Sequence, residues 1–202
     1  MKDISQPRYN VEERYNALLN AGEELFCIEY DLAEPKLIAE KAGVSVGLFY
    51  RHFKNKREML TEIMVKHLDR LHQQIAAKLE LELEPEAALY KLIGLTLKYF
   101  QQHQKIIKLF FLEVGYGDFV ATAKLSQARQ NYRNFIAEII TAGMQQRIFL
   151  DSGTLDLELA INSIIGTINW SMYDILIVQN KSLEPEIYTN RLVPHILRSL
   201  KV

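Results

Sequence analysis

The stretch Ile38–Leu60, IAEKAGVSVGLFYRHFKNKREML, predicts how the N-terminal part of this chain folds. An apolar helical pattern ends at Gly43, which can take the positive φ that ends a helix. Ser45 is a good N-cap for a second, short helix. Asn55, with Glu58 three residues later, is similar to a capping box and predicts the start of a third helix. Two helices joined by a tight turn and followed by basic residues predict a helix-turn-helix.

Basic residues are concentrated in this part of the chain. Positions 36 to 57 hold six lysines and arginines and one acidic residue, although the net charge of all 202 residues is only −1. A net charge close to zero argues against a protein that coats nucleic acid through a diffuse positive field. The local excess predicts a small basic surface instead, and a solvated helical face is the alternative interpretation.

The short helix carries side chains suited to DNA. Ser45 and the first N–H groups of the helix can bind a phosphate, and Gly47 lets the backbone lie close to DNA. Arg51 can reach a guanine edge with two hydrogen bonds. Phe49 and Phe53 lie four residues apart and are expected to face the core. The candidate DNA-binding residues are Lys36, Ser45, Val46, Gly47, Leu48, Tyr50, Arg51, His52 and Lys56.

This stretch resembles the signature of the TetR family of one-component transcriptional regulators, which is similar to IA..AGVS.G..Y.HF..K..L. The matching positions are Ile38, Ala39, Ala42, Gly43, Val44, Ser45, Gly47, Tyr50, His52, Phe53, Lys56 and Leu60. The resemblance implies a homodimer whose two helix-turn-helix heads bind a near-palindromic operator in double-stranded DNA. It implies phosphate contacts from Ser45, Tyr50, His52 and Lys56. It also implies that four residues face the bases, namely Val46, Gly47, Leu48 and Arg51.

Two departures from the family pattern affect the expected DNA contacts. The family usually caps the second helix with Thr, whereas this chain has Glu34 and Pro35 at that point. We therefore expect Lys36 to supply the phosphate contact there. Apolar Val46 and Leu48 replace the usual polar residues, and they can touch thymine methyl groups. This replacement predicts A/T-rich readout.

The remainder of the chain also has helical periodicity. Hydrophobic residues make up 49% of the chain and charged residues 24%, which suffices for a packed core. The expected helices lie near positions 10–28, 35–41, 46–53, 55–82, 85–102, 106–114, 119–146, 155–179 and 185–200. We predict an all-α fold of about nine helices. A helix-turn-helix DNA-binding domain is expected at 1–56, and a helical effector-binding and dimerisation domain at 57–202.

Aromatic residues are frequent between positions 85 and 179. Aromatic stripes at helical spacing most often form a core, but the family resemblance implies a small-molecule effector cavity in the same bundle. The candidate pocket residues are Tyr99, His103, Phe110, Phe111, Glu113, Tyr132, Phe135, Asn169, Trp170 and Tyr173. Such a lining predicts a lipophilic effector, for example an acyl chain or a drug-like compound.

Two C-terminal helices have broad apolar faces that must be shielded from water by other helices. The family resemblance places these helices in a four-helix interface between two copies of the chain. The candidate interface residues are Ile161, Ile164, Ile165, Ile168, Leu192, Ile196 and Leu197. Gly166 and Ser163 can permit close approach of the helices. We expect a bound effector to change the head separation from the roughly 34–36 Å that successive major grooves require.

Other classes of protein are less favoured. We recognise no nucleophile with its base, Gly-rich phosphate loop or metal cluster, so we expect no catalytic residue, metal or cofactor. The single Cys27 cannot form an internal disulfide, which fits a reducing cytoplasm. No secretory signal is indicated, and the uncharged stretch 159–173 is too short to span a membrane. We predict a cytoplasmic regulator, a repressor released by its effector; a helical interaction adaptor without specific DNA binding is the alternative.

Overall fold

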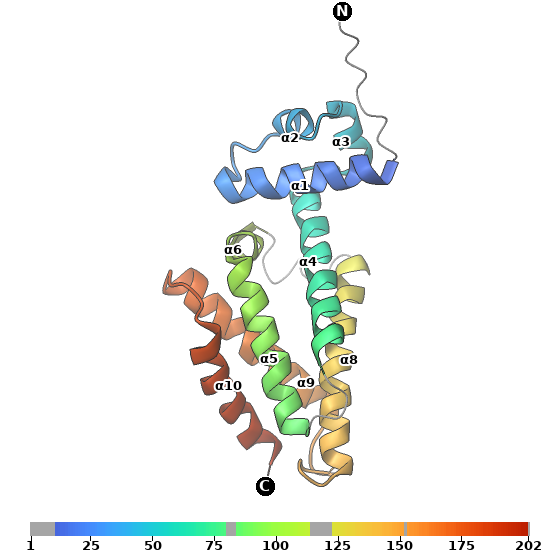
Figure 1. The fold of residues 1–202 in the computed structure, drawn as a ribbon. Coiled ribbons are helices and arrows are strands. Elements are labelled where there is room, and N and C mark those ends of the chain that lie inside the picture. Colours follow the sequence, from blue (N-terminus) through green and yellow to red (C-terminus); the bar gives the residue numbers. More distant parts are fainter. Residues whose placement is uncertain (1–10, 80–83, 114–122, 152, 202) are drawn as a thin grey trace, which may run out of the picture. The chain divides into compact units, whose positions relative to one another are not determined.

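The structure, a computed structural model, describes residues 11–79, 84–113, 123–151 and 153–201 (Figure 1). Within these ranges the chain forms nine α-helices, one π-helix and no strand, which confirms the predicted all-α fold. The chain divides into two compact units between Met64 and Val65. This boundary lies inside the helix α4 (Lys56–Lys78), whereas the end of the first domain is expected at position 56 from the sequence.

The first unit is built from short helices with well-defined ends. It contains α1 (Val11–Glu29), α2 (Pro35–Lys41), α3 (Val46–His52) and the beginning of α4. Pro35 lies in the first turn of α2, where its missing N–H costs nothing. Gly43, just after α2, has a φ of 68°, in the left-handed region that favours glycine. Because α2 packs against α3 across this turn, the two helices form the predicted helix-turn-helix.

The beginning of α4 shows the predicted capping interaction. The side-chain oxygen of Asn55 accepts a hydrogen bond from the Glu58 N–H at 2.9 Å. The Glu58 carboxylate in turn accepts one from the Lys54 N–H at 2.5 Å. In the usual capping box this second bond goes to the N-cap residue itself. Here it reaches one residue further back, so the carboxylate also fastens the segment that enters α4.

The core of the first unit holds α3 in place. Phe49 and Phe53 are fully buried as predicted, with ring centroids 5.5 Å apart. Gly22 allows α1 and α4 to pack closely, because a Cβ at this position would lie 2.5 Å from the Met59 sulfur. Other buried residues of this core are Leu18, Leu19, Ile38, Leu60 and Ile63. Since one face of α3 is anchored in this core, the opposite face is left for another partner.

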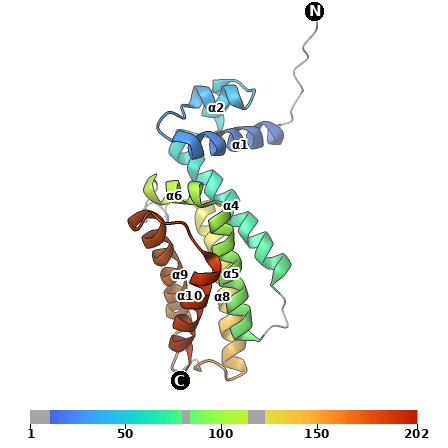
Figure 2. The ribbon, with the colours of Figure 1, turned by 60° about the vertical axis from the view of Figure 1, so that its left-hand side comes forward.

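The second unit is a helical bundle. Besides the rest of α4, it contains α5 (Pro85–Gln102), α6 (Gln104–Glu113), α8 (Ala123–Gln145), α9 (Leu157–Tyr173), the π-helix η1 (Asp174–Val178) and α10 (Pro185–Leu200). α5 packs against α8 and α10, and α9 packs against the same two helices, as Figures 1 and 2 show from two directions. None of the described helices is long and apolar enough to cross a membrane.

One feature of the bundle differs from the sequence expectation. The single helix expected at 155–179 is an α-helix that continues into the π-helix η1. The expected helix start at 119 lies outside the described residues.

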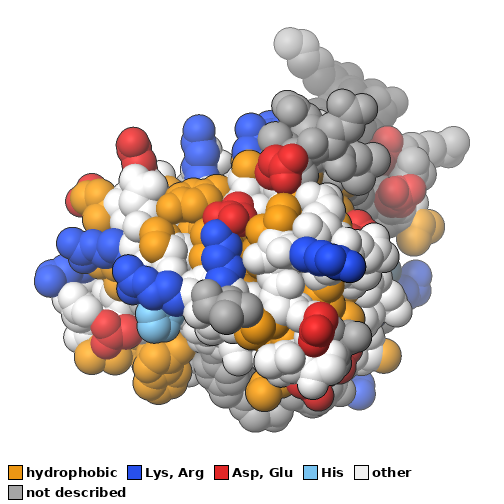
Figure 3. Space-filling model, turned by 90° about the horizontal axis from the view of Figure 1, so that it is seen from below, with side chains coloured by type: hydrophobic (Ala, Val, Ile, Leu, Met, Phe, Trp, Pro, Cys, Tyr) orange, Lys and Arg blue, Asp and Glu red, His pale blue; other side chains and the backbone are white. Residues whose placement is uncertain are grey.

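The end of the bundle at which α5 begins and α10 ends carries acidic and basic side chains interspersed with apolar ones (Figure 3). An ion pair of 2.5 Å joins Lys201 to Glu86 where these two helices end and begin.

Candidate nucleic-acid interface and effector region

The exposed face of α3 carries most of the predicted DNA-reading residues. Val46 and Tyr50 lie four residues apart with 42% and 59% of their surface exposed, and Gly47 and Arg51 are exposed beside them. This spacing puts the four residues on one side of the helix. Leu48 is half-buried. A short, well-anchored helix that projects one arginine and one tyrosine has the size and chemistry to enter a major groove.

The beginning of α3 is open to a partner. The Ser45 hydroxyl makes no capping hydrogen bond to the helix, although its backbone has the extended conformation of an N-cap. Gly47 has ample room for a side chain, because a Cβ there would meet only the Ser45 hydroxyl oxygen, at 3.9 Å. Packing inside the protein therefore does not require glycine at position 47. Close approach of another molecule to the helix backbone does explain a residue without a side chain.

Lys36 is placed at the beginning of α2, where the sequence predicted a phosphate contact. The side chain is exposed directly after Pro35. Glu34 occupies the N-cap position and makes no side-chain capping hydrogen bond. The first N–H groups of α2 therefore have no capping side chain, and a cation stands next to them. This arrangement favours an anion at this point.

Two other predicted phosphate donors have partners inside the first unit. The Lys56 ammonium donates hydrogen bonds to the Tyr30 carbonyl oxygen at 2.8 Å and to the Asp31 carbonyl oxygen at 3.1 Å. It also lies 4.6 Å from the centre of the Tyr30 ring. Lys56 thus fastens the connector between α1 and α2. The His52 ring packs edge-on against Tyr15, and its Nε2 atom is buried without a hydrogen-bond partner among the described residues.

One polar contact that the sequence did not suggest joins α1 to α4 within the first unit. The Tyr15 hydroxyl donates a hydrogen bond to the Glu62 carboxylate at 3.0 Å. Burial, together with the charge of Glu62, raises the pKa of Tyr15 well above its usual value. The hydroxyl therefore stays protonated at physiological pH and remains a donor. Tyr15 also stacks on Phe53, so this contact supports the anchor of α3.

Five of the ten predicted effector residues form two contact groups in the second unit. In the first, Tyr99 is buried and shares a hydrogen bond of 2.8 Å with His67, and the His103 ring lies 4.4 Å from the Tyr99 ring. In the second, Tyr173 stacks on Trp170 and meets the edge of Phe111. The remaining members are placed as follows: Phe110 is buried, Tyr132, Phe135 and Asn169 are half-buried, and Glu113 is exposed.

Tyr132 gives the bundle a neutral polar group. Its hydroxyl shares a hydrogen bond of 2.9 Å with Thr96, whose own hydroxyl donates to the Leu92 carbonyl at 2.8 Å. Because Thr96 uses its proton in that second bond, Tyr132 is the donor of the first. Burial raises the pKa of Tyr132 to about 12. The side chain is therefore uncharged at physiological pH, which suits an apolar surrounding.

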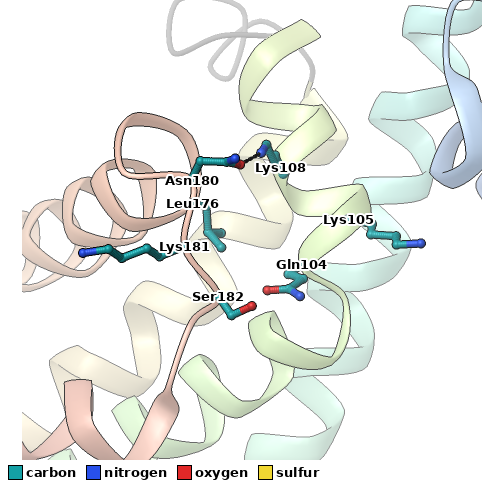
Figure 4. A pocket seen from close by; sticks show the side chains of 7 residues that line it. All are labelled: Gln104, Lys105, Lys108, Leu176, Asn180, Lys181 and Ser182. Atoms are coloured by element: carbon teal, nitrogen blue, oxygen red, sulfur yellow. Dashed lines mark hydrogen bonds between the residues drawn. The ribbon is translucent and has the colours of Figure 1, made fainter.

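A pocket of about 170 Å³ opens between α6 and the loop after η1 (Figure 4). It is lined by Gln104, Lys105, Lys108, Leu176, Asn180, Lys181 and Ser182. None of these residues was predicted from the sequence. The signal available was weak, because Lys105 and Lys108 read as an ordinary solvated pair three residues apart on one helix face. Only the fold brings them to the loop that holds Asn180.

The predicted interface residues lie mostly in the core of a single chain. Ile161, Ile164, Ile168, Ile196 and Leu197 are buried within the second unit, and Ile165 and Leu192 are half-buried. α9 nevertheless has an exposed stripe at helical spacing. Leu159 and Trp170, at 65% and 63% exposure, flank Ser163 and Gly166, and a Cβ at Gly166 would meet nothing within 4 Å. This stripe combines small and apolar residues on an open surface.

Comparison with known proteins agrees with this arrangement. Residues 18–63 match the family described as bacterial regulatory proteins, tetR family. The chain is 26% identical over 186 residues to the fatty acid metabolism regulator protein of Bacillus subtilis strain 168, covering 85% of this chain and 92% of that protein.

Solved structures with the same fold include two proteins named FadR. The fatty acid degradation regulator FadR from Bacillus halodurans has a TM-score of 0.75 at 21% identity and covers 93% of this chain and 100% of its own. FadR from Bacillus subtilis, in complex with stearoyl-CoA, has a TM-score of 0.76 at 20% identity and covers 91% of this chain and 97% of its own. At this level of identity, the likeness shows the shared fold.

Proposed function

Because this chain belongs to the tetR family of bacterial regulatory proteins, we propose that it is a cytoplasmic repressor whose homodimer binds a near-palindromic operator. The observation that carries the proposal is the exposed face of α3, which presents Gly47, Tyr50 and Arg51 while Phe49 and Phe53 anchor the other side. A regulator of this kind has no reaction to catalyse, so we propose no enzymatic activity. A helical adaptor without specific DNA binding is the alternative.

The proposed contacts divide into two groups. Val46, Gly47, Leu48 and Arg51 face the bases. Lys36, Ser45, Tyr50, His52 and Lys56 face the phosphates. For Lys56 this role requires an exchange of partners, since its ammonium now binds two carbonyl oxygens of the connector after α1. For His52 it requires the buried Nε2 atom to become accessible. We propose that Lys56 acts first by positioning α1 and α2, and that Lys36, Ser45 and Tyr50, which are exposed, make the first phosphate contacts with DNA.

The effector we propose is a long-chain acyl-CoA. Support comes from the relatives, since one is a fatty acid metabolism regulator and one solved neighbour is a complex with stearoyl-CoA. Further support comes from the second unit itself, whose aromatic side chains and neutral Tyr132 suit an acyl chain. Binding there would favour a conformation of the dimer that fits the operator less well. A coupling of about 1–3 kcal/mol is sufficient for regulation.

Stearoyl-CoA is expected to release the protein from its operator. The measurement is fluorescence anisotropy with a labelled fragment of the DNA upstream of the chain's own gene, with and without stearoyl-CoA. The operator affinity should fall about 5- to 150-fold when the effector saturates the protein. Free stearate at the same concentration is the control for a detergent effect, because such an effect would lower operator affinity equally with stearate and with stearoyl-CoA. An operator affinity that stearoyl-CoA leaves unchanged would remove this effector from consideration.

The exposed stripe of α9 is the surface we propose for the second copy of the chain. It contains Leu159, Ser163, Gly166 and Trp170, and the buried isoleucines behind it form the support of this surface. Two small residues between two large apolar ones allow a helix of the second copy to lie close. Isologous contact would place the same stripe on both sides of a two-fold axis.

Gly166→Leu is expected to weaken the dimer without unfolding the chain. The added side chain projects into open space in the single chain, because nothing lies within 4 Å of a Cβ there. In the dimer it would collide with the facing helix. Sedimentation equilibrium should show the dimer dissociation constant rise at least about 10-fold, which corresponds to roughly 1.4 kcal/mol. Ser126→Leu, which also places a leucine side chain on an exposed helix face, here that of α8, is the control. Equal dissociation constants for both variants would place the interface elsewhere.

A further inference from the structure

The pocket between α6 and the loop after η1 has the chemistry of an anion site. Three of its seven lining residues are lysines, Lys105, Lys108 and Lys181, and none of the seven is acidic. Gln104 and Lys105 are also the first two residues of α6, so the positive end of that helix dipole lies at the pocket. Cationic side chains beside a helix N-terminus favour a phosphate or another oxyanion.

Lys108 is the cation that the structure holds at the pocket. Its ammonium donates a hydrogen bond of 2.6 Å to the side-chain oxygen of Asn180. An amide oxygen orients the ammonium without neutralising it, so the charge remains available to an anion. In Figure 4 the ammonium groups of Lys105 and Lys181 extend away from the pocket on opposite sides. The Lys181 ammonium donates a hydrogen bond of 3.1 Å to the exposed Gln179 side-chain oxygen, a neutral acceptor that leaves its charge available. The flexible stems of both lysines allow them to turn toward a bound anion.

The loop that carries Asn180 is fixed by backbone hydrogen bonds. The Gln179 N–H donates to the Asp174 carbonyl at 2.8 Å, and the Lys181 N–H donates to the Ile175 carbonyl at 2.9 Å. Asn180 between them has a φ of 49°, a left-handed conformation that asparagine tolerates better than most residues. The position of Asn180 beside Lys108 therefore follows from the way η1 ends.

A second polar group of the pocket lacks a hydrogen-bond donor among the described residues. The side-chain oxygen of Gln104 is buried and accepts no hydrogen bond from the described residues. Gln104 and Ser182 face each other across the pocket in Figure 4. A buried acceptor without a donor is unfavourable, so a ligand that brings an N–H or O–H group would be stabilised here. A ligand for this pocket thus combines an anionic group with a hydrogen-bond donor.

We propose that this pocket binds the phosphate-bearing head of the effector, with Lys108 as the fixed cation and Gln104 as the acceptor for an amide or amino group of the head. This inference rests on the proposed acyl-CoA effector, whose CoA part carries phosphates, amides and an amino group. The volume of about 170 Å³ is smaller than the roughly 300–1,000 Å³ of sites that enclose a whole ligand. The pocket can therefore enclose only part of the head, such as one phosphate with a neighbouring amide or amino group, and the acyl chain lies elsewhere in the second unit.

The test is isothermal titration calorimetry of the full chain with stearoyl-CoA, CoA, stearate and inorganic phosphate. The variants are Lys108→Gln, which retains a donor for Asn180 but removes the charge, and Lys181→Gln on the exposed loop. Loss of a charge-assisted contact should weaken stearoyl-CoA binding roughly 10- to 100-fold in Lys108→Gln. The affinity of CoA for Lys108→Gln should fall by a similar factor, and the affinity of stearate should stay within about twofold of its wild-type value. Lys91→Gln, an exposed lysine of α5, is the matched control.

The outcomes separate this site from the proposed regulation. If stearoyl-CoA binds the wild type and both pocket variants equally, the head site is overturned and the effector stands. If CoA or phosphate binds with dependence on Lys108 but stearoyl-CoA does not release the operator, the anion site is supported and the proposed effector fails. Should Lys108→Gln melt below the wild type, Lys181→Gln provides the same comparison with an exposed side chain.

Discussion

Replacing Tyr50 and Arg51 together by alanine is expected to abolish specific operator binding while the first unit stays folded. Both side chains lie on the exposed face of α3, and only the Tyr50 ring touches the core, at the edge of Phe49. A bidentate arginine contact to a base pair contributes about 1–3 kcal/mol of discrimination. A tyrosine hydrogen bond to a charged phosphate contributes roughly 1.5–3 kcal/mol. Together they predict a loss of roughly 100-fold or more, measured by fluorescence anisotropy on the operator fragment.

The controls for this experiment follow from the structure. Thermal unfolding followed by circular dichroism should give the wild-type transition for the double variant. Lys98→Ala, which removes an exposed cation from α5, should leave operator affinity unchanged. Lys56→Ala is unsuitable as a partner of Tyr50→Ala, because Lys56 holds the connector after α1 and its loss would also disturb the fold. Operator affinity within about threefold of wild type in the double variant would favour the adaptor alternative.

Phe49→Ala is expected to unfold the first unit. The ring is fully buried and lies 5.5 Å from Phe53 and 5.3 Å from Tyr50, centroid to centroid. Truncation of a buried phenylalanine costs about 3–5 kcal/mol, because apolar contacts are lost and a cavity remains. That is a large share of the roughly 5–15 kcal/mol that stabilises a whole domain. Hydrogen exchange read by mass spectrometry should show loss of protection throughout α1 to α3.

The second unit provides the internal reference for that result. It forms a compact unit of its own from Val65 onward, so its amide protection and its stearoyl-CoA binding should persist. Val46→Ala, on the exposed face of the same short helix, should change stability by no more than about 0.5 kcal/mol. A Phe49→Ala protein with unchanged protection in α1 to α3 would contradict the assignment of this ring as the anchor of the helix-turn-helix.

The helix-turn-helix was predictable because its signals are local. Gly43 has the positive φ that its position required, and Asn55 and Glu58 form their cap within one turn of chain. Phe49 and Phe53 could be assigned to the core from their spacing alone. Such features depend on neighbours a few residues away, and a single sequence contains those neighbours.

The effector region was less predictable because its contacts join distant segments. The aromatic spacing indicated helices and a core, but it could not show that Tyr99 meets His67 or that Tyr132 meets Thr96. The pocket at α6 arises where a lysine meets an amide 72 residues later. The same applies to Lys56, whose ammonium finds carbonyl oxygens 25 and 26 residues earlier. Side-chain periodicity carries no information about such pairings.

The π-helical turn at the end of α9 sets the register of everything that follows it. A π-helix closes its hydrogen bonds over five residues, so it contains one more residue per turn than the α-helix that it extends. Each residue of an α-helix turns the chain by about 100°. Removing one residue from η1 would therefore rotate the next segment by about that angle, and Asn180 would turn away from Lys108. The π-helical turn thus helps to place Asn180 beside α6, and a deletion there is expected to remove the contact between Asn180 and Lys108.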